Sequence, residues 1–187
     1  GLFEHQDYWG QARFVGGTQN TCGNLTNYEM QNPAFPQDPL GNGITWNDQV
    51  SSVGVYPNTP LLDNSSLNYS TGWTPSSPWP RAVNNTVSFS DQTNATADYW
   101  FYGTGVTWIF TLANNRGIGN IKVTNSGGDV VYQADVDLYN PNIYWQRWHS
   151  VINLPRATYH LIITVTGTRN GASSGTYVDV DALLVHP

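Results

Sequence analysis

The stretch DYWFYGTGVTWIF, residues 98–110, decides the fold of this chain. Two runs rich in aromatic and β-branched residues, 100–102 and 106–112, lie on either side of the turn Gly103-Thr104-Gly105. Runs of this composition that lack inner Gly and Pro, and that end at turn residues, are typical of strands. We therefore expect two β-strands here, joined by a short glycine-bounded connection.

The same pattern continues on both sides of this stretch, and no segment is convincingly helical. Residues 50–56 alternate in the way a half-buried strand does. Turn residues separate the later runs, at Asn114-Asn115, Gly127-Gly128, Asn140-Pro141 and Asn170-Gly171. The expected strands after the central stretch are 119–124, 130–137, 144–152, 158–167 and 176–185. Short strands punctuated this regularly predict an all-β protein whose main part is an antiparallel β-sandwich.

The composition limits the function classes. The formal charge is −6 and Lys122 is the only lysine, so the clustered cations that neutralise nucleic-acid phosphates are missing. No run of 18 apolar residues predicts a membrane span. The single Cys22 has no internal disulfide partner. Few charges, many aromatics and crowded Asn-x-Ser/Thr sequons favour a secreted or cell-surface protein, with candidate glycans on Asn24, Asn64, Asn68, Asn84 and Asn94.

A domain boundary is expected at Tyr56-Pro57-Asn58-Thr59-Pro60, which divides the chain into 1–57 and 58–187. The first part is Gly- and Asn-rich and holds only two or three of the expected strands. A domain below about 60 residues buries too little surface to be stable alone without a metal, disulfides or a partner.

Two short motifs in the first part belong together. Phe3, Tyr8 and Gly10 have the spacing aromatic-x4-aromatic-x-Gly, and WNDQVSS follows at 46–52. Together they resemble the Greek-key signature and the calcium motif of the βγ-crystallins. The resemblance implies a calcium site, and a loop rich in amide, carboxylate and hydroxyl oxygens suits this ion. The implied ligands are Asn47, Asp48, the Gln49 carbonyl and Ser51. The alternative is a plain turn that starts at Asn47-Asp48 and is capped by the serines.

The family's domain contains two Greek keys, but only one is visible here. The missing half would come from the second domain or from another molecule, which makes a homo-oligomer or filament one hypothesis. A related bacterial peptidase-inhibitor family shares the WND-x-x-SS motif, so inhibition is another hypothesis.

The second part contains LLDNSSLNYSTGW (61–73), the central stretch, VDLYN (136–140) and a long closing segment at 159–185. These segments together resemble galactose-binding-like jelly rolls, the β-sandwich modules related to carbohydrate-binding modules. Aromatic faces and a few directed hydrogen bonds hold sugars. The candidates in loop-like positions are Trp73, Trp79, Tyr139, Tyr144 and Trp145, with Arg116, Asn115 and Asn170 as polar partners. For each aromatic, the alternative is a place in the core.

Related modules often hold a structural calcium between an early and a late acidic residue. The resemblance implies Asp63 for the first and Asp179 or Asp181 for the second. Asp179 and Asp181 are two residues apart on an expected strand and would share one face, where like charges favour a cation or a hydrogen-bond network. The alternative is a solvent-facing strand.

The sequence offers no catalytic constellation. It has only two glutamates, Glu4 and Glu29, and no G-x-S-x-G motif. The histidines have no metal-ligand spacing: His5, His149, His160 and His186. We therefore expect a non-catalytic, calcium-stabilised glycan-binding protein, with an extracellular structural subunit and a peptidase inhibitor as the alternatives.

Overall fold

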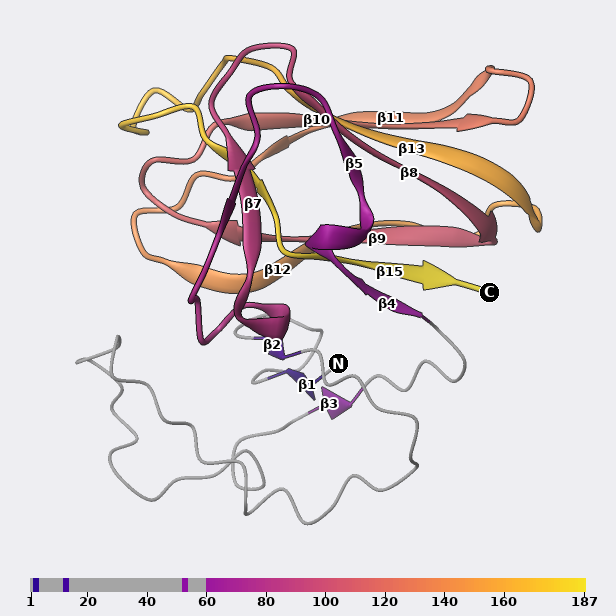
Figure 1. Ribbon diagram of the computed structural model, residues 1–187, viewed down its shortest axis with the longest axis horizontal. Coiled ribbons are helices and arrows are strands. Elements are labelled where there is room, and N and C mark those ends of the chain that lie inside the picture. The colour runs from indigo at the N-terminus through magenta and orange to yellow at the C-terminus, as the bar shows by residue number, and fades with distance from the viewer. Residues whose placement is uncertain (1, 4–11, 14–51, 54–59) are drawn as a thin grey trace. The chain divides into compact units, whose positions relative to one another are not determined.

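The computed structural model describes residues 2–3, 12–13, 52–53 and 60–187 (Figure 1). The chain divides into two compact units, Gly1–Val55 and Tyr56–Pro187. In the first unit, β1 (Leu2–Phe3) pairs antiparallel with β2 (Ala12–Arg13) and β3 (Ser52–Val53). The proposed calcium ligands at 47–51, Cys22 and most of the predicted Greek key lie outside the described residues, so these predictions stay untested.

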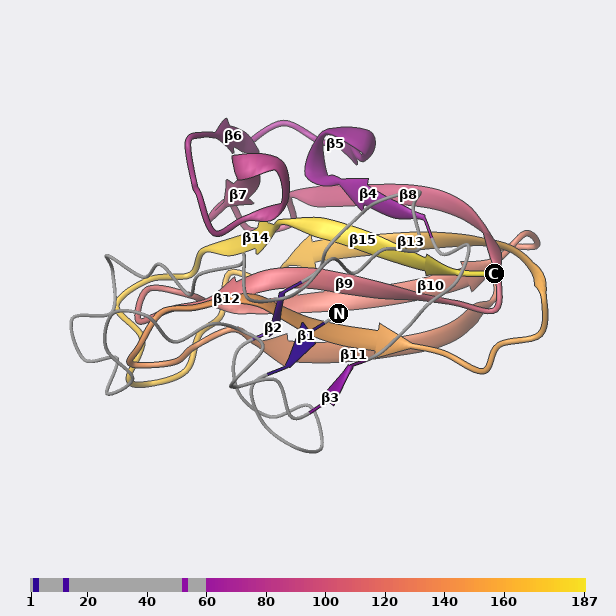
Figure 2. The same ribbon diagram turned by 90° about the horizontal axis from the view of Figure 1, so that it is seen from below.

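The second unit confirms the predicted all-β antiparallel sandwich, and its described residues contain no α-helix. One layer is a five-stranded sheet in the order β11-β10-β13-β8-β5, and the other is a four-stranded sheet in the order β12-β9-β15-β4 (Figures 1 and 2).

A small third sheet has the order β14-β7-β6. The strands of the five-stranded sheet are β11 (Val130–Asp137), β10 (Ile118–Asn125), β13 (Ala157–Val165), β8 (Thr96–Gly103) and β5 (Asn68–Tyr69). Those of the four-stranded sheet are β12 (Tyr144–Val151), β9 (Gly105–Leu112), β15 (Ala182–His186) and β4 (Leu61–Asp63). The small sheet is built from β14 (Val178–Val180), β7 (Val87–Ser90) and β6 (Thr74–Ser76), and two short 3-10 turns complete the unit, η3 (Asn64–Ser66) and η4 (Val83–Asn85).

The central stretch connects the two layers. β8 belongs to the five-stranded sheet and β9 to the four-stranded sheet, so the turn at Thr104 carries the chain from one layer to the other. A Cβ on Gly103 would lie 2.1 Å from the backbone oxygen of His186, and one on Gly105 would lie 2.3 Å from that of Val151. Both glycines are therefore required by the close approach of neighbouring backbone.

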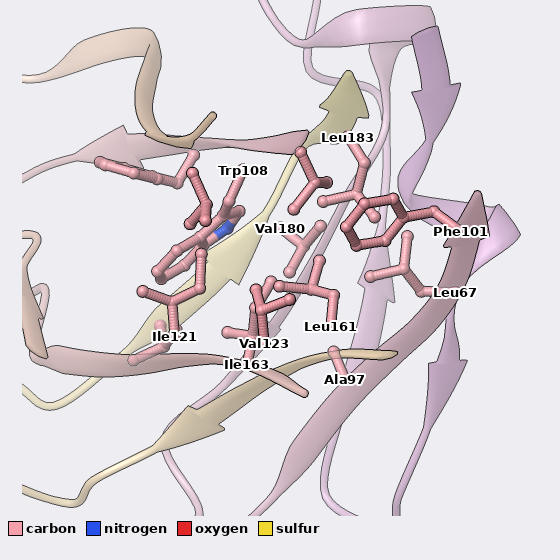
Figure 3. Close-up of a cluster of buried hydrophobic side chains, with 14 of the residues drawn as sticks. Leu67, Ala97, Phe101, Trp108, Ile121, Val123, Leu161, Ile163, Val180 and Leu183 are labelled. Atoms are coloured by element: carbon pink, nitrogen blue, oxygen red, sulfur yellow. The ribbon is translucent and has the colours of Figure 1, made fainter. Parts of the chain in front are cut away.

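The core lies between the two sheets (Figure 3). β8 contributes Ala97 and Phe101 to it, and β9 contributes Val106, Trp108 and Phe110. Alternate residues of β10, β13 and β15 also belong to the cluster, among them Ile121, Val123, Leu161, Ile163 and Leu183. Burying these side chains, each worth about 1.5–3 kcal/mol, is the main force that holds the two sheets together. The indole Nε1 of Trp108 donates to the Asp179 backbone oxygen at 3.1 Å, so this fully buried side chain is also satisfied.

The strand expected over 176–185 is divided in two. β14 pairs with β7 in the small sheet, whereas β15 pairs with β9 and β4 in the four-stranded sheet. Asp181 lies at the break, where its backbone N–H donates to the Ile109 oxygen at 2.9 Å. The spacing of Asp179 and Asp181 predicted that both lie on one continuous strand. In the structure Asp179 lies in β14, whereas Asp181 lies between β14 and β15.

Among the described residues, no helix has the length and apolar character needed to cross a membrane.

Candidate functional site

Four of the predicted ligand-binding aromatics lie near the C-terminal end of β9. Tyr144 pairs with Leu112 and Tyr139 forms a bridge with Ala113. The rings of Trp79 and Trp145 contact each other, with centroids 5.5 Å apart and planes inclined by 37°. We refer to Trp79, Trp145, Tyr144 and Tyr139 as the aromatic end.

The segment that carries Trp79 is held by its own hydrogen bonds. The indole Nε1 donates to Ser76 Oγ at 2.9 Å, and the backbone N–H donates to the Asn85 oxygen at the same distance. The Ala82 N–H in turn donates to the Trp79 backbone oxygen at 2.8 Å. The Trp79 side chain is nevertheless 40% exposed. Its orientation is therefore fixed while part of its ring is available to a ligand.

The segment that carries Trp145 is irregular. The register between β12 and β9 shifts between Tyr144 and Arg147, and Gln146 adopts a positive φ of 52°. A β-bulge of this kind re-aims the side chains next to it. The Gln146 Nε2 donates to the Arg81 backbone oxygen at 2.9 Å, which links the bulge to the segment after Trp79. The two tryptophans, 66 positions apart in the chain, are thus held together by the Gln146–Arg81 hydrogen bond as well as by their ring contact.

Two guanidinium groups lie close to this region in the sequence. Burial lowers the pKa of both Arg81 and Arg147, because the charged form loses solvent. Arg147 lies over the Trp148 ring, 5.0 Å from its centroid, in a cation–π contact. Both guanidinium groups stay protonated, and both are partly buried by other parts of the protein.

Trp73 and Arg116 have structural contacts. Trp73 packs against the core and its ring centroid lies 5.1 Å from that of Tyr69. The Arg116 Nε donates to Asp179 Oδ1 at 3.2 Å, and its Nη1 donates to Asn115 Oδ1 at 2.9 Å. Asn170 donates to Asp137 Oδ2 at 2.9 Å. The structure therefore joins neither Trp73 nor Arg116 to the aromatic end.

The three predicted acidic ligands have different surroundings. Asp63 accepts from Ser65 Oγ at 2.7 Å and from Thr86 Oγ1 at 3.1 Å. Asp179 is buried and accepts from the Thr111 backbone N–H as well as from Arg116. Arg116 therefore already compensates its charge.

Asp181 is the exception. It is fully buried, with Oδ1 accepting from the Val83 N–H at 2.7 Å, while Oδ2 has no hydrogen-bond partner. Burial, reinforced by the charges of Asp179 and Asp63, raises the pKa of Asp181 to about 8, although the Val83 hydrogen bond opposes the shift. No group of three or more His, Cys, Asp and Glu side chains forms a metal cluster among the described residues. Asp181 is thus a buried acid with an unsatisfied oxygen and a second carboxylate, Asp63, within electrostatic reach.

The described sequons differ in exposure. Asn64 is 3% exposed and its amide lies 2.8 Å from Ser88 Oγ and 2.7 Å from Thr86 Oγ1. A glycan on Asn64 would have to displace these contacts. The asparagines of the other three sequons are on the surface: Asn68, Asn84 and Asn94. Asn24 lies outside the described residues.

Two exposed aromatic side chains are not among the ligand-binding residues predicted from the sequence. Trp100 and Tyr102 are 51% and 62% exposed on β8, whereas Phe101 between them is in the core. The segment Tyr99–Tyr102 is aromatic at four consecutive positions, so hydrophobicity alone does not show which residues face outward. The one usable signal was the polar Asp98, which places the even-numbered positions on the outer face.

No family model matches the sequence, and a search of curated proteins finds no relative. Solved structures are similar in fold. A Paenibacillus xanthan lyase matches 71% of this chain at 16% identity with a TM-score of 0.52, over 13% of its own length. A two-domain esterase active on acetylated mannans, crystallised with mannopentaose, matches 74% of this chain at 8% identity with a TM-score of 0.53, over 39% of its length.

A C-terminal carbohydrate-binding module, the CBM6 of a laminarinase from Zobellia galactanivorans, matches over its whole length and 70% of this chain. The sequence identity is 16% and the TM-score is 0.44. The matches above 0.5 show the fold: the second unit is an antiparallel β-sandwich similar to parts of enzymes that act on polysaccharides. This chain spans less than two-fifths of either enzyme.

Proposed function

We propose that this chain is a non-catalytic carbohydrate-binding protein of the extracellular space, and that its aromatic end contacts the glycan. The observation that carries the proposal is the Trp79–Trp145 pair, because its hydrogen-bonded segments hold Trp79 in place while the ring stays 40% exposed. The ring faces of tryptophan suit the C–H-rich faces of sugars, and preorganised aromatic contacts cost little conformational entropy on binding.

The neighbouring tyrosines supply the directed contacts that a sugar also needs. Tyr139 and Tyr144 flank the end of β9 and are each partly exposed. A phenolic hydroxyl donates and accepts, so it can pair with a sugar hydroxyl of either polarity. The similarity in fold to parts of a xanthan lyase and a mannan esterase is compatible with this function, although a shared fold does not establish it.

We further propose that calcium stabilises the second unit through Asp63 and Asp181. The unpartnered Oδ2 of Asp181 fits an oxygen-seeking cation, and the Asp63 carboxylate adds a second anionic oxygen donor. Asp179 is left out of this ligand set because the Arg116 guanidinium already compensates its charge. A bound cation would supply charge compensation for two acids in one small region.

The proposed function is tested by affinity gel electrophoresis of the full chain in gels that contain mannan, xylan, β-1,3-glucan or cellulose derivatives. We expect retardation by at least one polysaccharide and a weaker retardation of the Trp79→Ala variant. Ile152→Ala, which removes an exposed apolar side chain from elsewhere on the surface, is the matched control and should migrate like the parent. Unchanged migration of the parent protein in every gel would refute the proposed function.

The two alternatives rest on the first unit, most of whose motif residues lie outside the described part of the chain. Assembly into an oligomer or filament predicts a calcium-dependent change in size, which size-exclusion chromatography with and without a chelator would detect. Inhibition predicts a stable complex with a peptidase. A monomer that polysaccharide retards supports the proposed function instead.

A further inference from the structure

The outer face of the five-stranded sheet carries a second group of aromatic side chains. Because Ala97, Phe101, Leu161 and Ile163 point into the core, the alternate residues of β8 and β13 point outward. The outward residues of β8 are Asp98, Trp100 and Tyr102, and they face Ile162, His160 and Thr158 of β13 in that order. We call Trp100, Tyr102, His160 and Asp98 the sheet platform.

Trp100 and His160 form a tight cross-strand stack. Their ring centroids are 4.3 Å apart and their planes differ by 4°, so His160 covers one face of the indole. The side chain of Trp100 is nevertheless 51% exposed, which leaves solvent access to its other face. The Trp100 ring thus projects from the sheet and is held by the His160 ring on one face.

Hydrogen bonds fix the supporting ring. His160 Nε2 lies 2.9 Å from Asp98 Oδ2, and the same carboxylate oxygen accepts from Asn68 Nδ2 at 3.3 Å. The platform therefore combines an aromatic face with a carboxylate and an amide whose positions are set by the sheet. This is the combination of ring face and directed polar groups that binds sugars.

The neighbouring strand β5 does not extend beside Trp100. β5 pairs only with Asp98 and Ala97, so β8 has no β5 partner from Tyr99 onward. Tyr102, two residues further along the same face, is 62% exposed. A cross-strand stack that served only to stabilise the sheet would not require a second exposed ring at the next outward position. Large aromatic side chains grouped on a surface mark interaction sites more often than isolated ones do.

We infer that the sheet platform is a second saccharide-binding surface, which takes neutral polysaccharide along β8, with Trp100 and Tyr102 contacting different sugar units. This inference rests on the proposed function and extends it, because the platform and the aromatic end are built on different sheets. The Asp98 carboxylate lies beside the indole and the whole chain is acidic, so a polyanionic chain would be repelled. The same carboxylate accepts hydrogen bonds from the hydroxyls of a neutral sugar.

Two surfaces on one chain make the protein bivalent for a polymer that carries many equivalent units. Engagement of both raises the apparent affinity for a long polysaccharide well above that for a short oligosaccharide, which fills one surface at a time. Two separate polysaccharide molecules bound by one protein would also be cross-linked.

The test uses the full chain and four variants: Trp79→Ala, Trp100→Leu, the double variant and Thr158→Ala. Leu keeps an apolar side chain opposite His160 but removes the ring face, and Thr158→Ala is the matched control on the same sheet face. Near-ultraviolet circular dichroism and thermal melting establish that each variant is folded. Binding to a neutral polysaccharide that retards the parent, and to its soluble oligosaccharide, is measured by affinity electrophoresis and isothermal titration calorimetry.

We expect Trp100→Leu to weaken polysaccharide binding about tenfold, to halve the oligosaccharide stoichiometry and to abolish cross-linking measured by turbidity. The double variant should lose binding altogether, and Thr158→Ala should match the parent. If Trp79→Ala alone removes all binding and a folded Trp100→Leu binds like the parent, the platform is refuted while the proposed function stands. If the parent binds no polysaccharide, the proposed function fails and the platform fails with it.

Discussion

The substitution Asp181→Asn tests how the buried acid shapes the stability of the second unit. In the unfolded chain Asp181 titrates near 3.8, but in the folded protein its pKa is raised to about 8. The folded state therefore binds one more proton than the unfolded state between these values, and the free energy of unfolding falls as the pH rises. Each pH unit in this window costs about 1.4 kcal/mol, so Asp181 lowers the free energy of unfolding by roughly 3 kcal/mol from pH 5 to pH 7.

Asparagine removes this titration but keeps an oxygen for the Val83 N–H. It also buries an amide NH2 where Oδ2 had no partner, which shifts the absolute stability at every pH by a similar amount. The informative quantity is therefore the change with pH in the difference between variant and parent. This difference also cancels the contributions of His149 and His186 to the pH dependence. Burial lowers the pKa of both histidines, so their contribution to the free energy of unfolding rises with pH in the same range.

Urea denaturation of both proteins at pH 5, 6, 7 and 8, in the presence of a chelator, measures this difference. We expect the variant to gain roughly 3 kcal/mol relative to the parent between pH 5 and pH 7, which corresponds to a shift of several degrees in melting temperature. Calcium should stabilise the parent more than Asp181→Asn at pH 7. Parallel pH profiles for the two proteins would show that Asp181 ionises normally, and an equal calcium response would show that it is not a ligand.

Three further substitutions and one control substitution test the packing. Arg116→Met leaves Asp179 buried without its cation and should cost about 3–5 kcal/mol in urea denaturation; a loss below 1 kcal/mol would contradict this. Gly103→Ala forces a Cβ against backbone and should cost about 1–3 kcal/mol, whereas Gly171→Ala, with open space around it, should change stability by less than about 0.5 kcal/mol. Trp108→Ala should cost about 3–5 kcal/mol, and a melting temperature near that of the parent would show that this ring is not central to the core.

The long strands of the sandwich were predictable because their signals are local. Residues 130–137 alternate between exposed and half-buried positions along β11, and the turn residues on either side end the strand where the structure ends it. The same holds for 144–152, where the observed β12 differs by a single residue. Antiparallel strands bounded by turns carry this information in their own sequence, so neither the pairing partner nor the layer has to be known.

The layers were not predictable in the same way. Gly103 and Gly105 predicted a turn, but the approach of His186 and Val151, which makes both glycines necessary, depends on residues 46 to 83 positions later in the chain. The division of 176–185 has a similar origin, because β14 and β15 follow different partner strands. Local propensity sets where a strand is formed, whereas non-local backbone contacts set which sheet it joins.

The candidate sites show the same limit at the level of single side chains. Asp179 and Asp181 are equivalent in sequence terms, since both follow a valine in a β-rich run. Arg116 and the Thr111 N–H satisfy one of them, whereas the other keeps an oxygen without a partner. Because an arginine 63 positions away decides this, only the assembled fold distinguishes the paired acid from the one that is free to take a proton or a cation.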